Sequence, residues 1–279
     1  MGRWRSASPA TVLGLIALLI AVGSILPALW AQNFQGFQID ESDEQRANES
    51  LLPAPDRVTL QQFQRAKDAL DRHRYGEVLE NLDGILKGSE DSFFQPDKKA
   101  TTFRSLKVEA RQLIGELPPE GRQLYESRCG ADARAMLNKA VTSGDSAVLA
   151  EVAGRYFHTQ AGYEATFLLG LRQLDHGSPV AGAMTLRRLR EISDAAERFE
   201  PALSLALAAC WLRAGMPGDA TDVLVELKRR QSNAPLHIGG REIAWFSGRQ
   251  DAVGWLESTM GASPAAESVA VDAWAMFRG

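Results

Sequence analysis

Four histidines and two cysteines are the residues of this chain with the chemistry to bind a transition metal or to act as nucleophiles. The histidines are far apart in the sequence and form no His-Glu-x-x-His pair: His73, His158, His176 and His237. The cysteines form no Cys-x-x-Cys pair of the kind that zinc sites contain. His176 precedes a glycine in the run Leu-Asp-His-Gly, where a place at a helix end accounts for it. The sequence predicts no metal site.

Catalytic motifs are also missing from the sequence. It contains no Gly-x-Ser-x-Gly elbow, and the Gly239-Gly240 pair follows no Rossmann or P-loop pattern, so we interpret it as a turn. A cluster of carboxylates, Asp40, Glu41, Asp43 and Glu44, lies in a polar segment where solvation keeps acids from the shifted pKa that general acid catalysis needs. We therefore expect a protein that is not an enzyme and that binds no cofactor.

The two cysteines differ in their surroundings. Cys210 lies in an apolar helical run and is predicted to be a buried free thiol. Cys129 ends the polar run Gln-Leu-Tyr-Glu-Ser-Arg-Cys and is predicted to be exposed. A disulfide between them stays possible, because sequence alone does not place two sulfur atoms relative to each other.

Residues 1–31 have the layout of an export signal. Arg3 and Arg5 precede an apolar stretch from Val12 to Leu29, and polar sequence follows Ala31. About 18 apolar residues are just enough to span a bilayer, so a retained membrane anchor, a cleaved signal peptide and a buried helix are the three alternatives. The basic start predicts that the rest of the chain lies outside the cytoplasm, in the periplasm.

Residues 32–56 contain six acids, one arginine and two prolines, and this composition predicts an extended, flexible linker. The whole chain carries a net charge of −4. No basic patch large enough for nucleic acid is evident, so we expect a protein partner, with membrane contact through the N-terminal segment.

Apolar residues recur with a helical period through residues 57–235. The spacing predicts a helical hairpin from Leu60 to Leu86, a longer helix from Ala100 to Leu117, and another helix that ends at Gly130. Strand-type alternation is limited to a small hairpin around Ile238 to Phe246, with its turn at Gly239 and Gly240.

Three further helix pairs are each interrupted by a glycine: Gly144, Gly177 and Gly215. Glycine suits such turns because a helix often ends with a left-handed backbone conformation. The recurrence is close to the 34-residue period of stacked helix-turn-helix units, in which each pair buries its apolar side against its neighbours. We expect an all-α solenoid.

The helix pair around Gly215 resembles a tetratricopeptide repeat. The matching positions are Leu207, Ala208, Trp211, Gly215, Ala220, Leu224 and Leu227. The pair around Gly177 keeps Leu169, Gly170, Gly177, Leu186 and Leu189, but has Gln173 in place of an aromatic residue and Gly182 in place of alanine. The first pair keeps little beyond its turn and apolar spacing. Divergent units cover about Asp132 to Arg230, which implies a tetratricopeptide-like, noncatalytic scaffold.

Members of that family bind extended peptides on the concave face formed by the first helix of each pair. Where some members place Lys and Asn to clamp a C-terminal carboxylate, this chain has apolar residues, so the resemblance implies contact with a hydrophobic segment. The predicted contact residues are Phe167, Leu171 and Leu205. A plain internal core is the alternative for such a stripe. Arg187, Arg188 and Arg190 are predicted to lie on a solvated outer face.

Residues 236–279 end in Trp-Ala-Met-Phe-Arg-Gly, which is similar to the segment that leads into the first blade of bacterial PQQ-binding-like β-propeller proteins. The helical stretches before it are similar to the region that precedes such propellers. This second resemblance implies an alternative, in which the chain is the N-terminal helical portion of an envelope assembly factor or quinoprotein-type enzyme whose propeller lies elsewhere.

Overall fold

The computed structural model describes residues 52–96, 102–231, 235–238 and 241–260. The predicted signal or anchor, most of the linker and the Trp-Ala-Met-Phe-Arg-Gly segment lie outside the described residues. The described helices and strands belong to one compact unit that begins at Pro55. Within the described part of the chain, no helix is both long and apolar enough to cross a membrane.

The first two helices form the predicted hairpin. Helix α4 spans Arg57–Asp71 and α5 spans Tyr75–Lys87. Helix α4 begins at Asp56, whose Oδ1 accepts a hydrogen bond from the Thr59 backbone N–H at 2.7 Å. The predicted apolar stripes face each other, with Phe63 and Leu82 both buried. Leu60, the apolar residue with which the predicted hairpin begins, is 37% exposed instead.

The next helix, α6, starts later than predicted. Two short antiparallel strands, β1 (Phe93–Phe94) and β2 (Arg104–Ser105), precede it, and α6 spans Leu106–Gly115. The Ser105 hydroxyl accepts a hydrogen bond from the Val108 backbone N–H at 3.0 Å and so fixes the helix start. The predicted start at Ala100 was wrong. Helical periodicity does not reveal that Ser105 belongs to strand β2 and also caps the helix that follows.

Helix α7 spans Pro119–Ser143 without interruption, so the predicted end at Gly130 was also wrong. A glycine inside a helix costs only about 1 kcal/mol relative to alanine. Buried residues on both sides of Gly130, including Tyr125 and Leu137, offset that cost by packing along the same helix.

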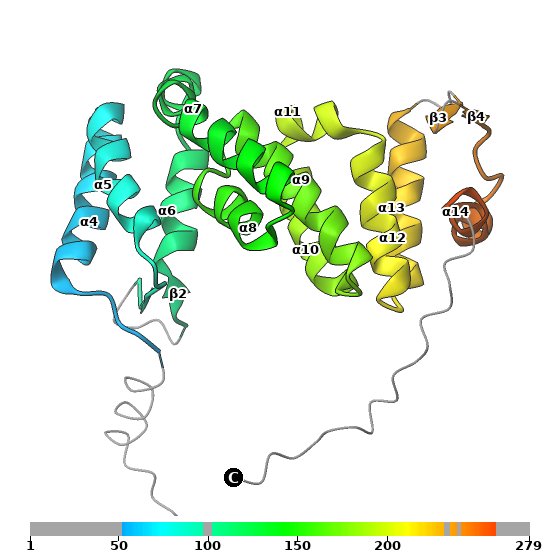
Figure 1. The fold of residues 1–279 in the computed structure, drawn as a ribbon, viewed down its shortest axis with the longest axis horizontal. Helices are drawn as coiled ribbons and strands as arrows, with labels where there is room; N and C mark the ends of the chain where they lie inside the picture. The colour runs from blue at the N-terminus through cyan, green and yellow to red at the C-terminus, as the bar shows by residue number, and fades with distance from the viewer. Residues whose placement is uncertain (1–51, 97–101, 232–234, 239–240, 261–279) are drawn as a thin grey trace, which may run out of the picture. The chain divides into compact units, whose positions relative to one another are not determined.

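Three helix pairs follow, as predicted, around their glycine turns. Helix α7 pairs with α8 (Ser146–Arg155), α9 (Gln160–Asp175) with α10 (Pro179–Arg190), and α12 (Ala202–Arg213) with α13 (Pro217–Arg230). The turn glycines are left-handed, with φ of +70° at Gly144, +74° at Gly177 and +75° at Gly215. Each helix packs mainly on its neighbours in the sequence, so the described region is a mostly helical domain of sequentially packed pairs (Figure 1).

A short insertion lengthens the interval between the last two pairs. It contains α11 (Ser193–Ala196) and the 3-10 helix η1 (Glu197–Phe199). Ala195 and Ala196 are buried in the same core as α10 and α12. The insertion is therefore part of the packed domain.

The C-terminal part of the described chain begins with the predicted hairpin, β3 (Leu236–Ile238) and β4 (Arg241–Ile243), in which Ile238 pairs with Arg241. The 3-10 helix η2 (Arg249–Asp251) leads into α14 (Ala252–Met260). Trp245 and Trp255 stack with ring centroids 5.3 Å apart. Buried residues of this segment, including Leu256, join the core of α12 and α13.

Candidate functional site

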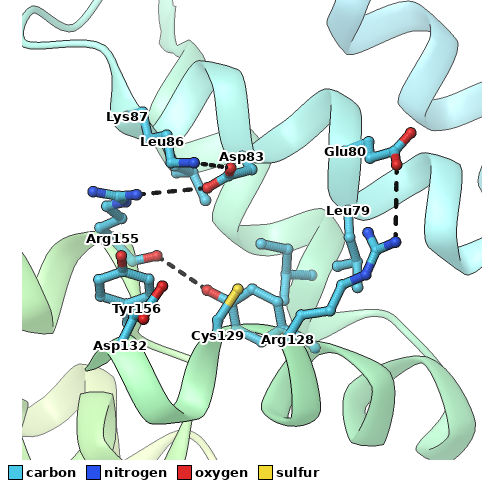
Figure 2. Close-up of a pocket in the computed structure, with 12 residues that line it drawn as sticks. Leu79, Glu80, Asp83, Leu86, Lys87, Arg128, Cys129, Asp132, Arg155 and Tyr156 are labelled. Carbon is cyan, nitrogen blue, oxygen red and sulfur yellow. Dashed lines mark hydrogen bonds and ion pairs between the residues drawn. The ribbon is translucent and has the colours of Figure 1, made fainter. Parts of the chain in front are cut away.

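A pocket of about 200 Å³ lies between α5, α7 and α8 (Figure 2). Its floor is apolar and contains Leu79, Leu86, Ile114 and Tyr125. Its rim carries charges of both signs: Glu80, Asp83 and Asp132 against Lys87, Arg128 and Arg155. Cys129 and Tyr156 complete the lining.

Ion pairs join the three helices around this pocket. Asp83 pairs with Lys87 one turn later on α5, and its other oxygen lies 3.7 Å from the Arg155 guanidinium on α8 (Figure 2). Arg128 on α7 lies 3.8 Å from the Glu80 carboxylate. These pairs are partly solvated and each contributes on the order of 1 kcal/mol or less, so their main effect is to hold the rim in one geometry.

Tyr125 connects the floor of the pocket to the end of α8. Its hydroxyl donates a hydrogen bond to the Arg155 carbonyl at 3.1 Å. Burial raises the pKa of the Tyr125 phenol, so it stays protonated and keeps donating at neutral pH. The Arg155 guanidinium lies 4.7 Å from the centre of the Tyr156 ring, a cation–π distance.

The Cys129 thiol is the candidate nucleophile among the residues that line this pocket, but its surroundings oppose reactivity. Burial, together with the nearby Asp83 carboxylate, raises the pKa of the thiol above its ordinary value. The thiolate is the reactive form, and a raised pKa keeps it scarce at neutral pH. The arrangement is suited to binding a group with an apolar body and a polar end, with the thiol as part of the wall.

Cys129 and Cys210 are both free thiols, so the disulfide alternative does not occur in the structure. Cys210 is fully buried on α12, as predicted, and burial raises its pKa to about 12. The prediction that Cys129 is exposed was wrong, because this side chain is half-buried between two apolar cores.

The prediction for the arginines of α10 holds only for Arg187, which is exposed and lies 3.6 Å from Glu191. Arg188 is partly buried, with its guanidinium 4.4 Å from the centre of the Phe157 ring. Arg190 is half-buried, and among the described residues its Nε has no hydrogen-bond partner. Helical rotation explains the correction at Arg188, because successive residues point about 100° apart and Arg188 therefore does not share the outer face of Arg187.

Arg188 donates a hydrogen bond to the C-terminal end of the neighbouring helix α8. The last carbonyls of α8 lack partners within that helix. Arg188 donates to the Ala153 carbonyl at 3.0 Å, Arg111 on α6 donates to the Gly154 carbonyl at 3.4 Å, and Tyr125 donates to Arg155. Side chains from three helices thus satisfy the end of a fourth, and the two cations also suit the negative end of its dipole.

His158 lies beside this network, in the turn between α8 and α9. It packs edge-on against Phe157, with ring centroids 4.8 Å apart, and against Gly115, where a Cβ atom would lie only 2.7 Å from its Cε1. Burial lowers the pKa of His158 to about 4; a hydrogen bond to the Arg111 backbone opposes the shift, and nearby arginine charges add to it. His158 is therefore a neutral packing residue at pH 7.

The remaining histidines have separate surroundings. His176 is the C-cap residue of α9, as predicted, with its Nδ1 2.7 Å from the Arg172 carbonyl. His73 and His237 are exposed on other elements. Among the described residues no group of three or more His, Cys, Asp or Glu side chains is arranged to hold a metal ion. The predicted acidic cluster from Asp40 to Glu44 lies outside the described residues.

The three predicted contact residues lie on the first helices of adjacent pairs. Phe167 and Leu171 are one turn apart on α9, and Leu205 lies on α12. All three are partly buried and pack against one apolar core. The structure therefore brings these three residues together at the same core. Phe167 also contacts Phe199 of the insertion, with ring centroids 5.2 Å apart.

The pocket between α5, α7 and α8 was not predicted from the sequence. The spacing of Asp83 and Lys87 is a usable signal for an ion pair on one helix. Nothing in the sequence indicates that Arg155, 72 positions beyond Asp83, reaches the same carboxylate.

No protein-family model matches this chain, and comparisons with curated proteins and with solved structures find no match.

Proposed function

We propose that the helical unit is a noncatalytic, tetratricopeptide-like scaffold that holds a protein partner at the periplasmic side of the cell envelope. The observation that carries this proposal is the position of large apolar side chains that stay partly exposed on the first helices of neighbouring pairs, at Phe167, Leu171 and Leu205. Stacked pairs keep such side chains at fixed spacing, which favours an extended apolar segment as the ligand.

The packing of the repeat positions supports the tetratricopeptide resemblance. In the pair around Gly215 the apolar positions of the pattern are all buried: Leu207, Ala208, Trp211, Ala220, Leu224 and Leu227. In the preceding pair, a Cβ on Gly182 would lie 3.0 Å from both the Cys210 Sγ and the Gly170 carbonyl. That crowding explains why glycine replaces the usual alanine at this position.

Site-specific photo-crosslinking in cells tests the contact surface. A photoreactive amino acid at Leu205 is expected to crosslink a partner, and Leu171→Asp is expected to abolish the product. The matched control places the same amino acid at Met184, which lies on α10 and is 49% exposed. Equal crosslinking at both positions, or full crosslinking in a folded Leu171→Asp variant, contradicts the proposal.

N-terminal sequencing of the protein from cells tests the location. A start at Gln32 indicates export with cleavage after Ala31, and an intact N-terminus in the membrane fraction indicates an anchor. An intact N-terminus in the cytosolic fraction contradicts the envelope location.

The propeller-linked alternative rests on a sequence observation, the terminal Trp-Ala-Met-Phe-Arg-Gly segment. In that case the partly exposed apolar residues contact a propeller instead of a separate peptide. The identity of the product crosslinked at Leu205 distinguishes the two, because a propeller protein favours the alternative.

A further inference from the structure

A second cavity of about 520 Å³ adjoins the pocket of Figure 2. It lies among the C-terminal end of α5, helix α6 and the C-terminal end of α8. The two cavities share Leu86, Lys87 and Arg155. Two of the lining side chains, Lys107 and Arg111, donate hydrogen bonds to carbonyls at the ends of α5 and α8. The cavity remains open beside these contacts.

The lining of the second cavity is cationic. Lys87, Lys107, Arg111 and Arg155 contribute positive charge, and Glu151 contributes the one carboxylate among its lining residues. This differs from the first pocket, where the charges of both signs are equal in number.

The counterions of these cations are unevenly distributed. Lys87 pairs with Asp83, and Arg155 lies within 3.8 Å of both Asp83 and Glu151. Among the described residues, neither Lys107 nor Arg111 forms an ion pair with a carboxylate. Lys107 donates to the Gly88 carbonyl at 2.5 Å, and Arg111 donates to the Gly154 carbonyl at 3.4 Å.

Asp91 is the acid that acts on Arg111 electrostatically, but its oxygens are engaged elsewhere. One accepts from the Ser105 hydroxyl at 2.5 Å, and the other accepts from the backbone N–H groups of Ser92 and Lys107. A guanidinium has five N–H donors. Arg111 therefore retains unused donors, and within the described part of the chain the buried Nε of Arg155 also has no partner.

Removing a cation from water without a counterion is unfavourable, and burial lowers the pKa of Arg111 accordingly. An anion in the cavity offsets this cost by pairing with the desolvated guanidinium. An oxyanion suits this position, since the guanidinium fork can donate to two oxygen atoms of one carboxylate or phosphate group at once.

We propose that this cavity binds the oxyanion group, carboxylate or phosphate, of a small molecule, with Arg111 and Lys107 as its principal contacts. The cavity is larger than a bare phosphate ion, so the ligand carries a further neutral portion that lies against Leu86 and Gly154. This small-molecule site is distinct from the apolar contact surface and does not depend on it.

Titration of the full-length chain with two probes tests the site. Inorganic phosphate and succinate are added separately at constant ionic strength, with sodium chloride as the balancing salt, while amide NMR shifts and the Tm are recorded. We expect a saturable response at the amides of Gly88 and Gly154 with at least one probe. Saturation with phosphate alone identifies a phosphate ligand, and saturation with succinate alone identifies a carboxylate ligand.

Two variants and a control connect the response to the cavity. Arg111→Met is expected to weaken binding about tenfold or more, because a hydrogen bond to a charged group is lost. Arg111→Lys, which keeps the charge, is expected to retain part of the affinity. Arg65→Met changes an exposed arginine on α4, away from the cavity, and is expected to bind as the wild type does.

Lys107→Met provides the same comparison if Arg111→Met does not fold, as judged by circular dichroism. The proposal is overturned if neither probe gives a saturable response in the wild type. It is also overturned if the folded variants bind both probes as tightly as the wild type.

Discussion

Acidification is expected to destabilise the domain through His158. The pKa of this residue is lowered from 6.5 to about 4, mainly by burial. Arg111, Arg122 and Arg188 all disfavour a further positive charge at this position. In the folded state the His158 imidazole therefore stays neutral, whereas in the unfolded chain it takes up a proton as the pH falls below 6.5.

The sign of the effect follows from this difference. The contribution of His158 to the free energy of unfolding is complete above pH 6.5 and decreases as the pH falls from 6.5 to 4. One pKa unit corresponds to about 1.4 kcal/mol, so the total loss is about 3 kcal/mol. About 2.5 kcal/mol of it is expected to be lost by roughly pH 4.5.

Urea unfolding followed by circular dichroism, from about pH 7.5 to about pH 4.5, measures this contribution in the wild type and in His158→Gln. Carboxylates titrate over part of the same range, so the relevant quantity is the difference between the two proteins at each pH. We expect the wild type to lose about 2.5 kcal/mol more than the variant across this range.

His237→Gln is the matched control, because His237 is exposed on β3. It is expected to leave the pH dependence of the wild type unchanged. A difference between wild type and His158→Gln that stays constant across the range refutes the reasoning, since His158 is then not desolvated in the folded state.

Three further outcomes follow from the packing. Gly162→Ala is expected to lower the free energy of unfolding by about 3 kcal/mol or more, because its Cβ would lie 1.8 Å from the Tyr156 carbonyl oxygen. Gly218→Ala, with no atom within 4 Å of the added Cβ, is expected to raise the Tm; the reverse order contradicts the packing of α9. Arg188→Met is expected to cost about 2 kcal/mol in urea unfolding by leaving the Ala153 carbonyl unpaired, against about 0.5 kcal/mol or less for the exposed Arg187→Met. The rate at which Cys129 reacts with a disulfide reagent is expected to keep rising at a pH where the rate of an exposed cysteine is already constant, and a plateau at the same pH as for an exposed cysteine argues against its burial.

The helical hairpins could be predicted from sequence because their signals are local. Gly144, Gly177 and Gly215 lie where a backbone must turn with positive φ, and the structure has them at +70° to +75°. The apolar period on either side predicts which residues are buried, as at Leu82 and Leu224.

The errors arose where a local signal had two possible outcomes. A glycine ends a helix at Gly144 but lies inside α7 at Gly130, and only the packing of the residues that follow distinguishes the two. The start of α6 depended on Ser105, whose role as a cap is fixed by its pairing with β1 and by Asp91.

The candidate sites were decided by tertiary structure. Sequence by itself determined a helical chain whose glycine turns separate amphipathic pairs, because turn geometry and apolar period depend on neighbouring residues. It could not place Asp83 beside Arg155, turn Arg188 inward onto the end of α8, or bring Arg111 to the Gly154 carbonyl. Those features depend on which faces of distant helices meet, and long charged side chains carry no periodic signal of where their ends lie.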